Sequence, residues 1–120
     1  MVGKDVRIHE MRLDPAPFGM MKRGEKTIEL RLYDEKRAAI QVGDLIRFTC
    51  TDGGETLTVR VTALYRFYSF DELYKALPLD KCGYAPDELD GASARDMDAY
   101  YPREEQAKYG VVGICVGLVK

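Results

Sequence analysis

Three charged side chains of both signs, Lys26, Glu29 and Arg31, lie within one short segment of the chain. A lysine ammonium is a compact donor for a phosphate or carbonyl oxygen, and a guanidinium offers a planar fork for phosphate or carboxylate. A carboxylate accepts hydrogen bonds from the edge of a base or acts as a general base. The three therefore suit a site that holds a polar ligand. The alternative is an ordinary strand face, with Lys26 solvated and Glu29 paired with a neighbouring cation.

The sequence around these residues predicts one rigid element, a strand over residues 27–33. Alternation of period two sends aliphatic side chains to one side of a sheet and polar ones to the other. The aliphatic residues are Ile28, Leu30 and Leu32, and they alternate with Glu29, Arg31 and Tyr33. Before this strand we expect a short helix over 17–23, which Gly24 ends. Lys26 is then held just beside the strand.

The remaining elements predict an α+β domain. A hairpin loop at Asp52-Gly53-Gly54 joins two strands, and a capping box, Ser69 with Glu72, begins a helix. We expect further strands over 6–13, 45–51, 56–67 and 111–119, and further helical segments over 34–39, 69–77, 93–100 and 102–108. Short strands with helices around them are typical of a small mixed or antiparallel β-barrel. A length of 120 residues fits a single domain over 1–120.

Charge, hydrophobic pattern and cysteine content argue against several classes of protein. A net charge of −2 and a pI of about 5.4 argue against a general nucleic-acid coat, but leave room for a local basic site. There is no run of about 18 apolar residues and no signal-peptide pattern, so we expect no membrane partner. An odd number of cysteines without CxxC spacing predicts a cytoplasmic protein with no metal site. These are Cys50, Cys82 and Cys115, of which Cys50 and Cys115 are expected to pack as small hydrophobes.

Aromatic residues supply candidates for stacking on a base. Tyr33 and Tyr68 are the preferred ones, because Tyr65 and Phe67 share the parity of the core valines at 59 and 61. Tyrosines at 100, 101 and 109 are expected to pack the last helix onto the sheet, although a hydroxyl could reach a cleft. His9 has no obvious partner that would make it a catalytic base. We expect no cofactor, since neither a Walker A motif nor GxGxxG is present.

The segment Gly24-Glu25-Lys26-Thr27-Ile28-Glu29-Leu30-Arg31 fits the pattern G-x-K-x-x-E-x-R and resembles the signature of the ASCH domain. Residues 40–48 and 109–114 fit the same family, and the resemblance extends from about residue 11 to 114. It implies a PUA-like pseudo-barrel with a cleft lined by the charged residues of the motif. The partner it implies is RNA or a nucleotide-like small molecule, bound by Lys26, Glu29 and Arg31, and the stacking candidates Tyr33 and Tyr68 complete the expected binding residues. The oligomeric state stays open.

A bacterial branch of similar small ASCH proteins implies an alternative, the hydrolysis of N4-acetylcytidine by a lysine, a threonine and a glutamate. The lysine corresponds to Lys26, but Glu29 stands in the threonine position, and Thr27 has the wrong parity on the strand. The glutamate would be Glu55 or Glu72. In that case Lys26 and Glu29 would be the catalytic acid–base pair, with water as the nucleophile. A third possibility is a protein-interaction module whose charged cleft is incidental.

Overall fold

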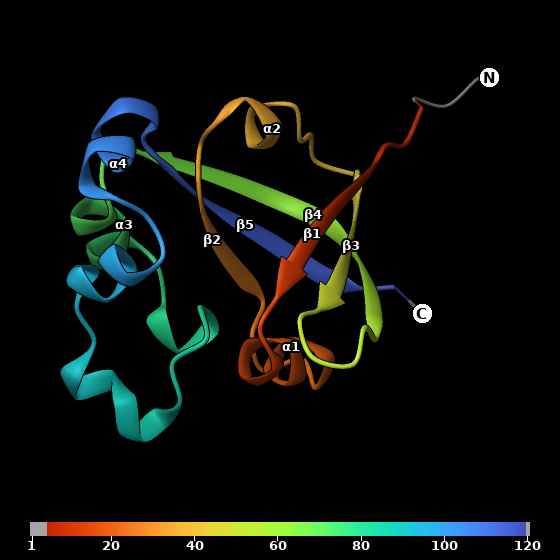
Figure 1. Ribbon diagram of the computed structural model, residues 1–120, viewed down its shortest axis with the longest axis horizontal. Coiled ribbons are helices and arrows are strands. Elements are labelled where there is room, and N and C mark those ends of the chain that lie inside the picture. Colours follow the sequence, from red (N-terminus) through yellow and green to blue (C-terminus); the bar gives the residue numbers. More distant parts are fainter. Residues whose placement is uncertain (1–4, 120) are drawn as a thin grey trace.

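The computed structural model of the protein describes residues 5–119 and contains one five-stranded mixed sheet. Its strands are β1 (Ile8–Leu13), β2 (Ile28–Leu32), β3 (Leu45–Cys50), β4 (Thr56–Phe67) and β5 (Val111–Leu118). They lie in the order β1-β3-β4-β5-β2, with β1 parallel to β3 and all other neighbours antiparallel. The sheet curls into a half-barrel whose edges are β1 and β2 (Figure 1). The predicted α+β class with a small mixed barrel-type sheet is confirmed.

The helices are short, and most of them gather in one lobe. They are α1 (Pro15–Lys22), α2 (Glu35–Ala38), α3 (Phe70–Ala76) and α4 (Arg103–Tyr109), with 3-10 helices at Leu79–Lys81, Pro86–Gly91 and Ala94–Ala99. α1 lies at one end of the half-barrel, whereas residues 70–109 form a helical lobe beside β2 (Figure 1). The segment predicted as helix over 93–100 is a 3-10 helix, which begins where Ser93 accepts a hydrogen bond from the Arg95 N–H.

The two faces of β2 are both buried, because the strand lies between two hydrophobic cores. Side chains inside the half-barrel form one core, and those between β2 and the helical lobe form the other. The first includes Ile46, Phe48, Val59 and Ile114, and the second includes Leu30, Leu32, Phe70 and Leu73. The polar side of β2 is therefore not an exposed strand face, and Glu29 is only 5% exposed.

A β-bulge in β4 overturns one prediction about its aromatic residues. The pairing of β4 with β5 shifts register between Val61 and Ala63, and such a bulge reverses the side-chain parity that follows it. Leu64 therefore packs against the half-barrel core, while Tyr65 is 49% exposed rather than buried. Phe67 packs instead against the core under the helical lobe.

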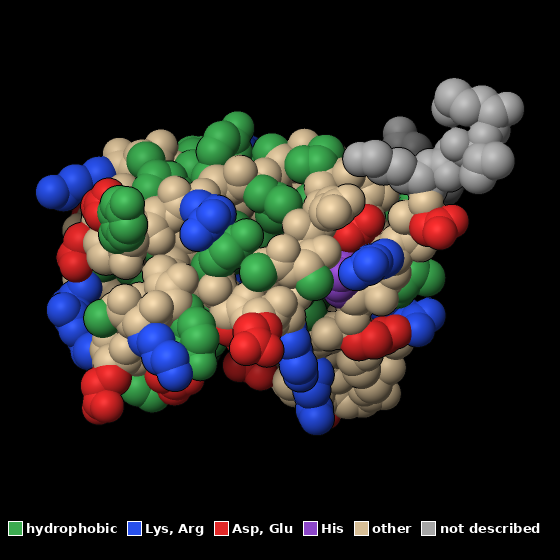
Figure 2. All heavy atoms as spheres, turned by 90° about the horizontal axis from the view of Figure 1, so that it is seen from above, with side chains coloured by type: hydrophobic (Ala, Val, Ile, Leu, Met, Phe, Trp, Pro, Cys, Tyr) green, Lys and Arg blue, Asp and Glu red, His purple; other side chains and the backbone are tan. Residues whose placement is uncertain are grey.

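His9 also differs from expectation, since it has a partner. Its Nε2 lies 2.8 Å from Oδ2 of Asp44, a buried residue just before β3, and neither residue lines the cleft described below. Among residues 5–119 no group of three metal-ligating side chains is found, and no helix there is long and apolar enough to cross a membrane. Cys50 and Cys82 are buried free thiols, and Cys115 is a partly buried one. Acidic and basic side chains are interspersed on the face seen in Figure 2.

Candidate functional site

A cleft of about 660 Å³ lies between the edges of the half-barrel and the helical lobe. Its volume is within the range of small-molecule sites, roughly 300–1,000 Å³. One side is formed by the end of β1, by Pro17 of α1 and by β2, and the other by α3, the loop around Tyr84 and the 3-10 helix Ala94–Ala99. Lys26, Glu29 and Arg31 all line it, so the structure brings together the three charged residues that the sequence singled out.

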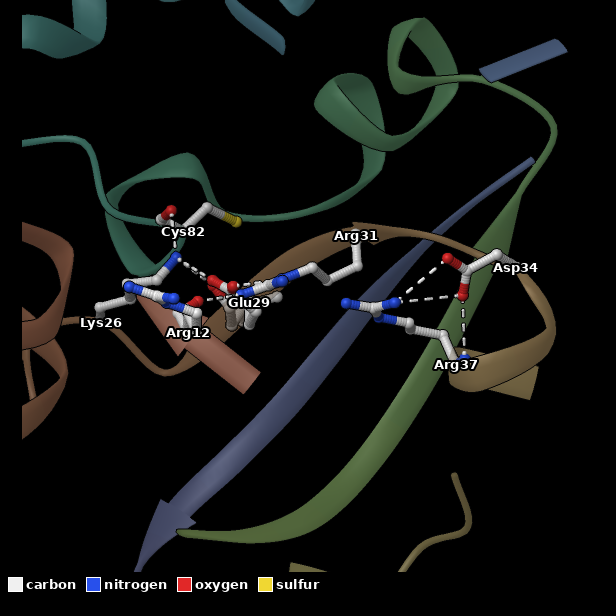
Figure 3. A network of polar contacts seen from close by, with 8 residues as sticks. Arg12, Lys26, Glu29, Arg31, Asp34, Arg37 and Cys82 are labelled. Carbon is white, nitrogen blue, oxygen red and sulfur yellow. Dashed lines mark hydrogen bonds and ion pairs between the residues drawn. The ribbon is translucent and has the colours of Figure 1, made fainter. Parts of the chain in front are cut away.

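Glu29 joins the other two charged residues at the floor of the cleft. Its Oε1 lies 3.1 Å from Lys26 Nζ, and its Oε2 accepts a hydrogen bond of 2.6 Å from Arg31 Nε (Figure 3). The Lys26 and Glu29 side chains are almost fully buried, and Arg31 is 14% exposed. Alternation along β2 directs Glu29 and Arg31 to the same side of the strand, while Lys26 reaches them from the turn before it.

Lys26 is fixed by backbone as well as by charge. Its ammonium donates to the carbonyl oxygens of Ile28 at 2.9 Å and Cys82 at 2.8 Å, in addition to the Glu29 contact (Figure 3). An ammonium has three protons, and each has an acceptor here. Lys26 therefore ties β2 to the helical lobe and leaves no free proton for a ligand.

Arg31 ties together the two open edges of the sheet. Its Nη2 donates to the carbonyl oxygen of Arg12 in β1 at 2.7 Å, although β1 and β2 are not neighbours in the hydrogen-bonded sheet. Together with the bond to Glu29 this uses two of the five guanidinium protons. Among residues 5–119 the three remaining N–H groups have no hydrogen-bond partner, so they are available to a ligand in the cleft.

The electrostatics keep Glu29 ionised. Burial alone raises the pKa of its carboxyl group, but the charges of Lys26 and Arg31 and their hydrogen bonds outweigh burial, so the pKa is lowered overall. Burial lowers the pKa of Arg31, yet the neighbouring Glu29 charge raises it overall. Glu29 is thus a fixed hydrogen-bond acceptor and Arg31 a fixed donor. A lowered pKa also makes Glu29 a weak general base.

The same pKa shift predicts an acid-sensitive contribution to stability. The folded-state pKa of Glu29 lies below its ordinary value of 4.5, so the unfolded state binds more protons and folding is favoured as the pH rises. The contribution is complete above that ordinary value and is lost as the pH falls through the lowered one. Urea denaturation from neutral pH to about pH 3 should show a shallower loss of stability in Glu29→Gln than in wild type. Parallel curves would contradict the assignment.

Tyrosines form the wall that faces the charged floor. Tyr74, Tyr84, Tyr100 and Tyr101 all line the cleft. The Tyr101 ring is anchored by stacking on Phe70, with centroids 6.1 Å apart, while Tyr100 is exposed. Burial raises the pKa of Tyr101, the more so because Glu29 is near, although the Arg31 charge lowers it in part. Tyr101 packs against the core under the helical lobe, as the sequence predicts, whereas Tyr100 does not, and both residues line the cleft.

The other predicted site residues lie elsewhere. Tyr33 packs under Arg66, whose guanidinium carbon lies 3.9 Å from the ring centroid, and Tyr68 is 86% exposed. Neither residue lines the cleft, nor do the glutamates that the hydrolase resemblance suggested. Glu55 pairs with Lys22 on the surface, and Glu72 lies exposed in the first turn of α3. Nothing in the sequence singles out Tyr74 or Tyr84 as a site residue, because Tyr74 has helical spacing with Phe70 and Leu77, which is typical of a packing residue, and no periodic pattern surrounds Tyr84.

Comparisons with known proteins identify a family and several structures of similar fold. The model of the ASCH domain matches residues 11–120. The crystal structure of the hypothetical protein PH0355 is similar, with a TM-score of 0.78 and 33% identity over 93% of this chain and 99% of that one. The solution structure of protein PF0455 from Pyrococcus furiosus has a TM-score of 0.70 and 34% identity, covering 94% and 98%. A crystal structure of ASCH from Zymomonas mobilis shares the fold, with a TM-score of 0.65 and 12% identity over 94% and 68%. No curated protein matches the chain.

Proposed function

The chain belongs to the ASCH domain family, and on this premise we propose that its cleft binds the base of a nucleotide, either free or within a single-stranded RNA. The observation that carries the proposal is the Glu29–Arg31 pair, a fixed acceptor beside a fixed donor at the floor of a tyrosine-walled cleft. The edge of a base presents donors and acceptors side by side, and its flat faces stack on aromatic rings. A cleft that combines both features suits a base better than an aliphatic or purely anionic ligand.

The cleft also offers a cation for the phosphate. Arg12 lines the rim and is exposed, and among the described residues its guanidinium has no hydrogen-bond or ion-pair partner. A guanidinium is well matched to phosphate oxygens. Arg95, on the opposite rim, is already paired with Asp71. Arg12 is therefore the group that we assign to the phosphate.

This assignment predicts that nucleoside 5′-monophosphates bind about tenfold more tightly than the corresponding nucleosides, since one exposed charge-assisted contact is worth roughly 1.4 kcal/mol. Arg12→Ala should remove that difference without changing the affinity for nucleosides. Isothermal titration calorimetry at low salt measures both. Arg47→Ala is the matched control, because Arg47 is an exposed arginine engaged with Glu10 away from the cleft. An unchanged phosphate preference in Arg12→Ala would contradict the assignment.

The proposal itself is tested by titrating wild type with the four ribonucleoside monophosphates and with short single-stranded RNAs of mixed sequence. Saturable binding of either kind of ligand supports it, and the two sets of affinities distinguish a free nucleotide from an RNA strand. If no ligand binds at millimolar concentration in low salt, the proposal is wrong. The charged cleft would then be a structural feature of an interaction module.

The second candidate is hydrolysis of an acylated nucleoside, favoured by the 3.1 Å contact between Lys26 and Glu29 at the cleft floor. Such a contact suits an acid–base pair that activates water. However, every Lys26 proton already has an acceptor and Glu29 is a weak base, so the geometry favours binding over turnover. Incubation with N4-acetylcytidine and chromatography of the products decides between them. Release of cytidine by wild type and not by Lys26→Ala would establish the hydrolase.

A further inference from the structure

A chain of hydroxyl groups on the tyrosine wall has a defined direction. Tyr84 Oη lies 2.7 Å from Asp96 Oδ2, and Tyr74 Oη lies 2.6 Å from Tyr84 Oη. An ionised carboxylate only accepts, so the Tyr84 hydroxyl must donate to Asp96. Tyr84 then has no proton left for Tyr74, and the Tyr74 hydroxyl must donate to Tyr84. Burial raises the pKa of both phenols, so they stay protonated and the direction persists at neutral pH.

The consequence is that Tyr74 offers only lone pairs to the cleft. Its single proton points toward Tyr84, Tyr74 is one of the residues that line the cleft, and the lone pairs of its oxygen are what the hydroxyl can offer a ligand there. The hydroxyls of Tyr100 and Tyr101 rotate to donate or accept and set no preference. The wall therefore adds one fixed acceptor to the site.

The floor of the cleft also presents fixed hydrogen-bond acceptors. Each Glu29 oxygen takes one bond, from Lys26 or from Arg31, and has capacity for one more. Lys26 has no proton to spare, so the fixed donors that remain belong to Arg31. The interior thus presents three fixed acceptor positions, two on Glu29 and one on Tyr74, beside the guanidinium of Arg31.

The bases differ in how well they complement this pattern. Guanine carries three protons on one edge, at N1 and on the N2 amine, next to the O6 acceptor. Adenine and cytosine carry two protons on one exocyclic amine next to a ring nitrogen acceptor, and uracil carries one proton between two acceptors. Only guanine matches three acceptors beside one guanidinium. We propose that the cleft selects guanine, an inference that rests on the proposed function. In this arrangement Glu29 accepts from N1 and N2, Tyr74 accepts the second N2 proton, and Arg31 donates to O6.

The deciding experiment compares ligands and uses only wild-type protein, so no substitution can disturb the fold. Wild type is titrated with the 5′-monophosphates of guanosine, inosine, adenosine, cytidine and uridine. Inosine differs from guanosine only in lacking the N2 amine, and we expect its nucleotide to bind at least tenfold more weakly, because two hydrogen bonds are lost. The adenosine, cytidine and uridine nucleotides should bind more weakly still. If one of these three binds as tightly as the guanosine nucleotide, guanine selection is overturned while nucleotide binding stands. If none of the five binds, the proposed function itself fails.

A variant then tests the role of Tyr74. Tyr74→Phe removes the acceptor and keeps the ring, so it should weaken the guanosine nucleotide about fivefold and leave the inosine nucleotide unchanged. Tyr65→Phe, an exposed tyrosine outside the cleft, is the matched control and should change neither. Equal losses for both ligands in Tyr74→Phe would overturn the proposed recognition of the N2 amine.

Discussion

Replacing Glu29 with alanine is expected to lower the free energy of unfolding by about 3–5 kcal/mol, because removing one partner of a buried ion pair leaves the other charges uncompensated. Glu29 lies between Lys26 and Arg31, and all three are largely buried. Without its carboxylate, the ammonium keeps its two carbonyl partners, and the guanidinium keeps only the Arg12 carbonyl. Two like charges would then remain largely buried at the floor of the cleft without the carboxylate that lies between them.

Urea denaturation at neutral pH, followed by circular dichroism, measures this loss. The matched control is Glu25→Ala, which removes an exposed glutamate paired with Arg23 and should leave the midpoint unchanged. A triple variant, Lys26→Met with Glu29→Leu and Arg31→Met, replaces the whole network by apolar side chains of similar size. It should be more stable than Glu29→Ala, since no unpaired charge remains. If Glu29→Ala unfolds at the same denaturant concentration as Glu25→Ala, the buried network contributes nothing.

The sequence alone was sufficient to place the charged residues of the site but not their environment. Alternation along residues 28–32 correctly predicted a strand with Glu29 and Arg31 on one side. Their environment depends on contacts with residues that are distant along the chain, such as the Arg12 carbonyl in β1, which accepts from Arg31, and the Cys82 carbonyl, which accepts from Lys26. Local periodicity carries no information about such a contact. The sequence leaves a salt bridge and a ligand site as alternatives, and in the structure Glu29 forms the salt bridge at the floor of a cleft.

The aromatic half of the site was not predictable for a related reason. Tyr84 lies in a loop, and its position depends on hydrogen bonds to Tyr74 and Asp96 that no spacing rule indicates. For Tyr65 the sequence pattern predicts the wrong environment, because the expected burial assumes unbroken alternation of side chains along β4. One bulged residue reversed that parity. Period-two patterns are reliable only within an uninterrupted ladder.

The same contacts hold the fold together and shape the cleft. Lys26 joins β2 to the helical lobe through the Cys82 carbonyl, and Arg31 joins β2 to β1 through the Arg12 carbonyl. The half-barrel has two edge strands, β1 and β2, that do not pair with each other, and Arg31 bridges the gap between them. The charged floor is therefore rigid before any ligand binds, which lowers the ordering cost of recognition.

Arg31→Lys is expected to weaken nucleotide binding about 100-fold, although it keeps the positive charge. The hydrogen bond from Arg31 to the base would be lost, and the one that Glu29 accepts from the base would be misdirected. Each involves a charged group and is worth about 1.5 kcal/mol or more. Arg31 contacts Glu29 and the Arg12 carbonyl from two different nitrogens, Nε and Nη2, whereas a lysine carries its three protons on one nitrogen and lacks the planar fork, so it cannot reproduce both contacts while also donating to a base.

Calorimetric titration with the tightest-binding nucleoside monophosphate of the panel measures the loss of affinity, and thermal denaturation on the same samples shows that the variant is folded. Arg47→Lys is the matched control, because Arg47 also pairs with a glutamate but on the exposed outer surface. Its affinity should equal that of wild type. A folded Arg31→Lys variant that binds as tightly as Arg47→Lys would show that charge alone suffices. In that case the planar fork of Arg31 would act only to join β2 to β1, and base recognition would have to come from Glu29 and the tyrosine wall.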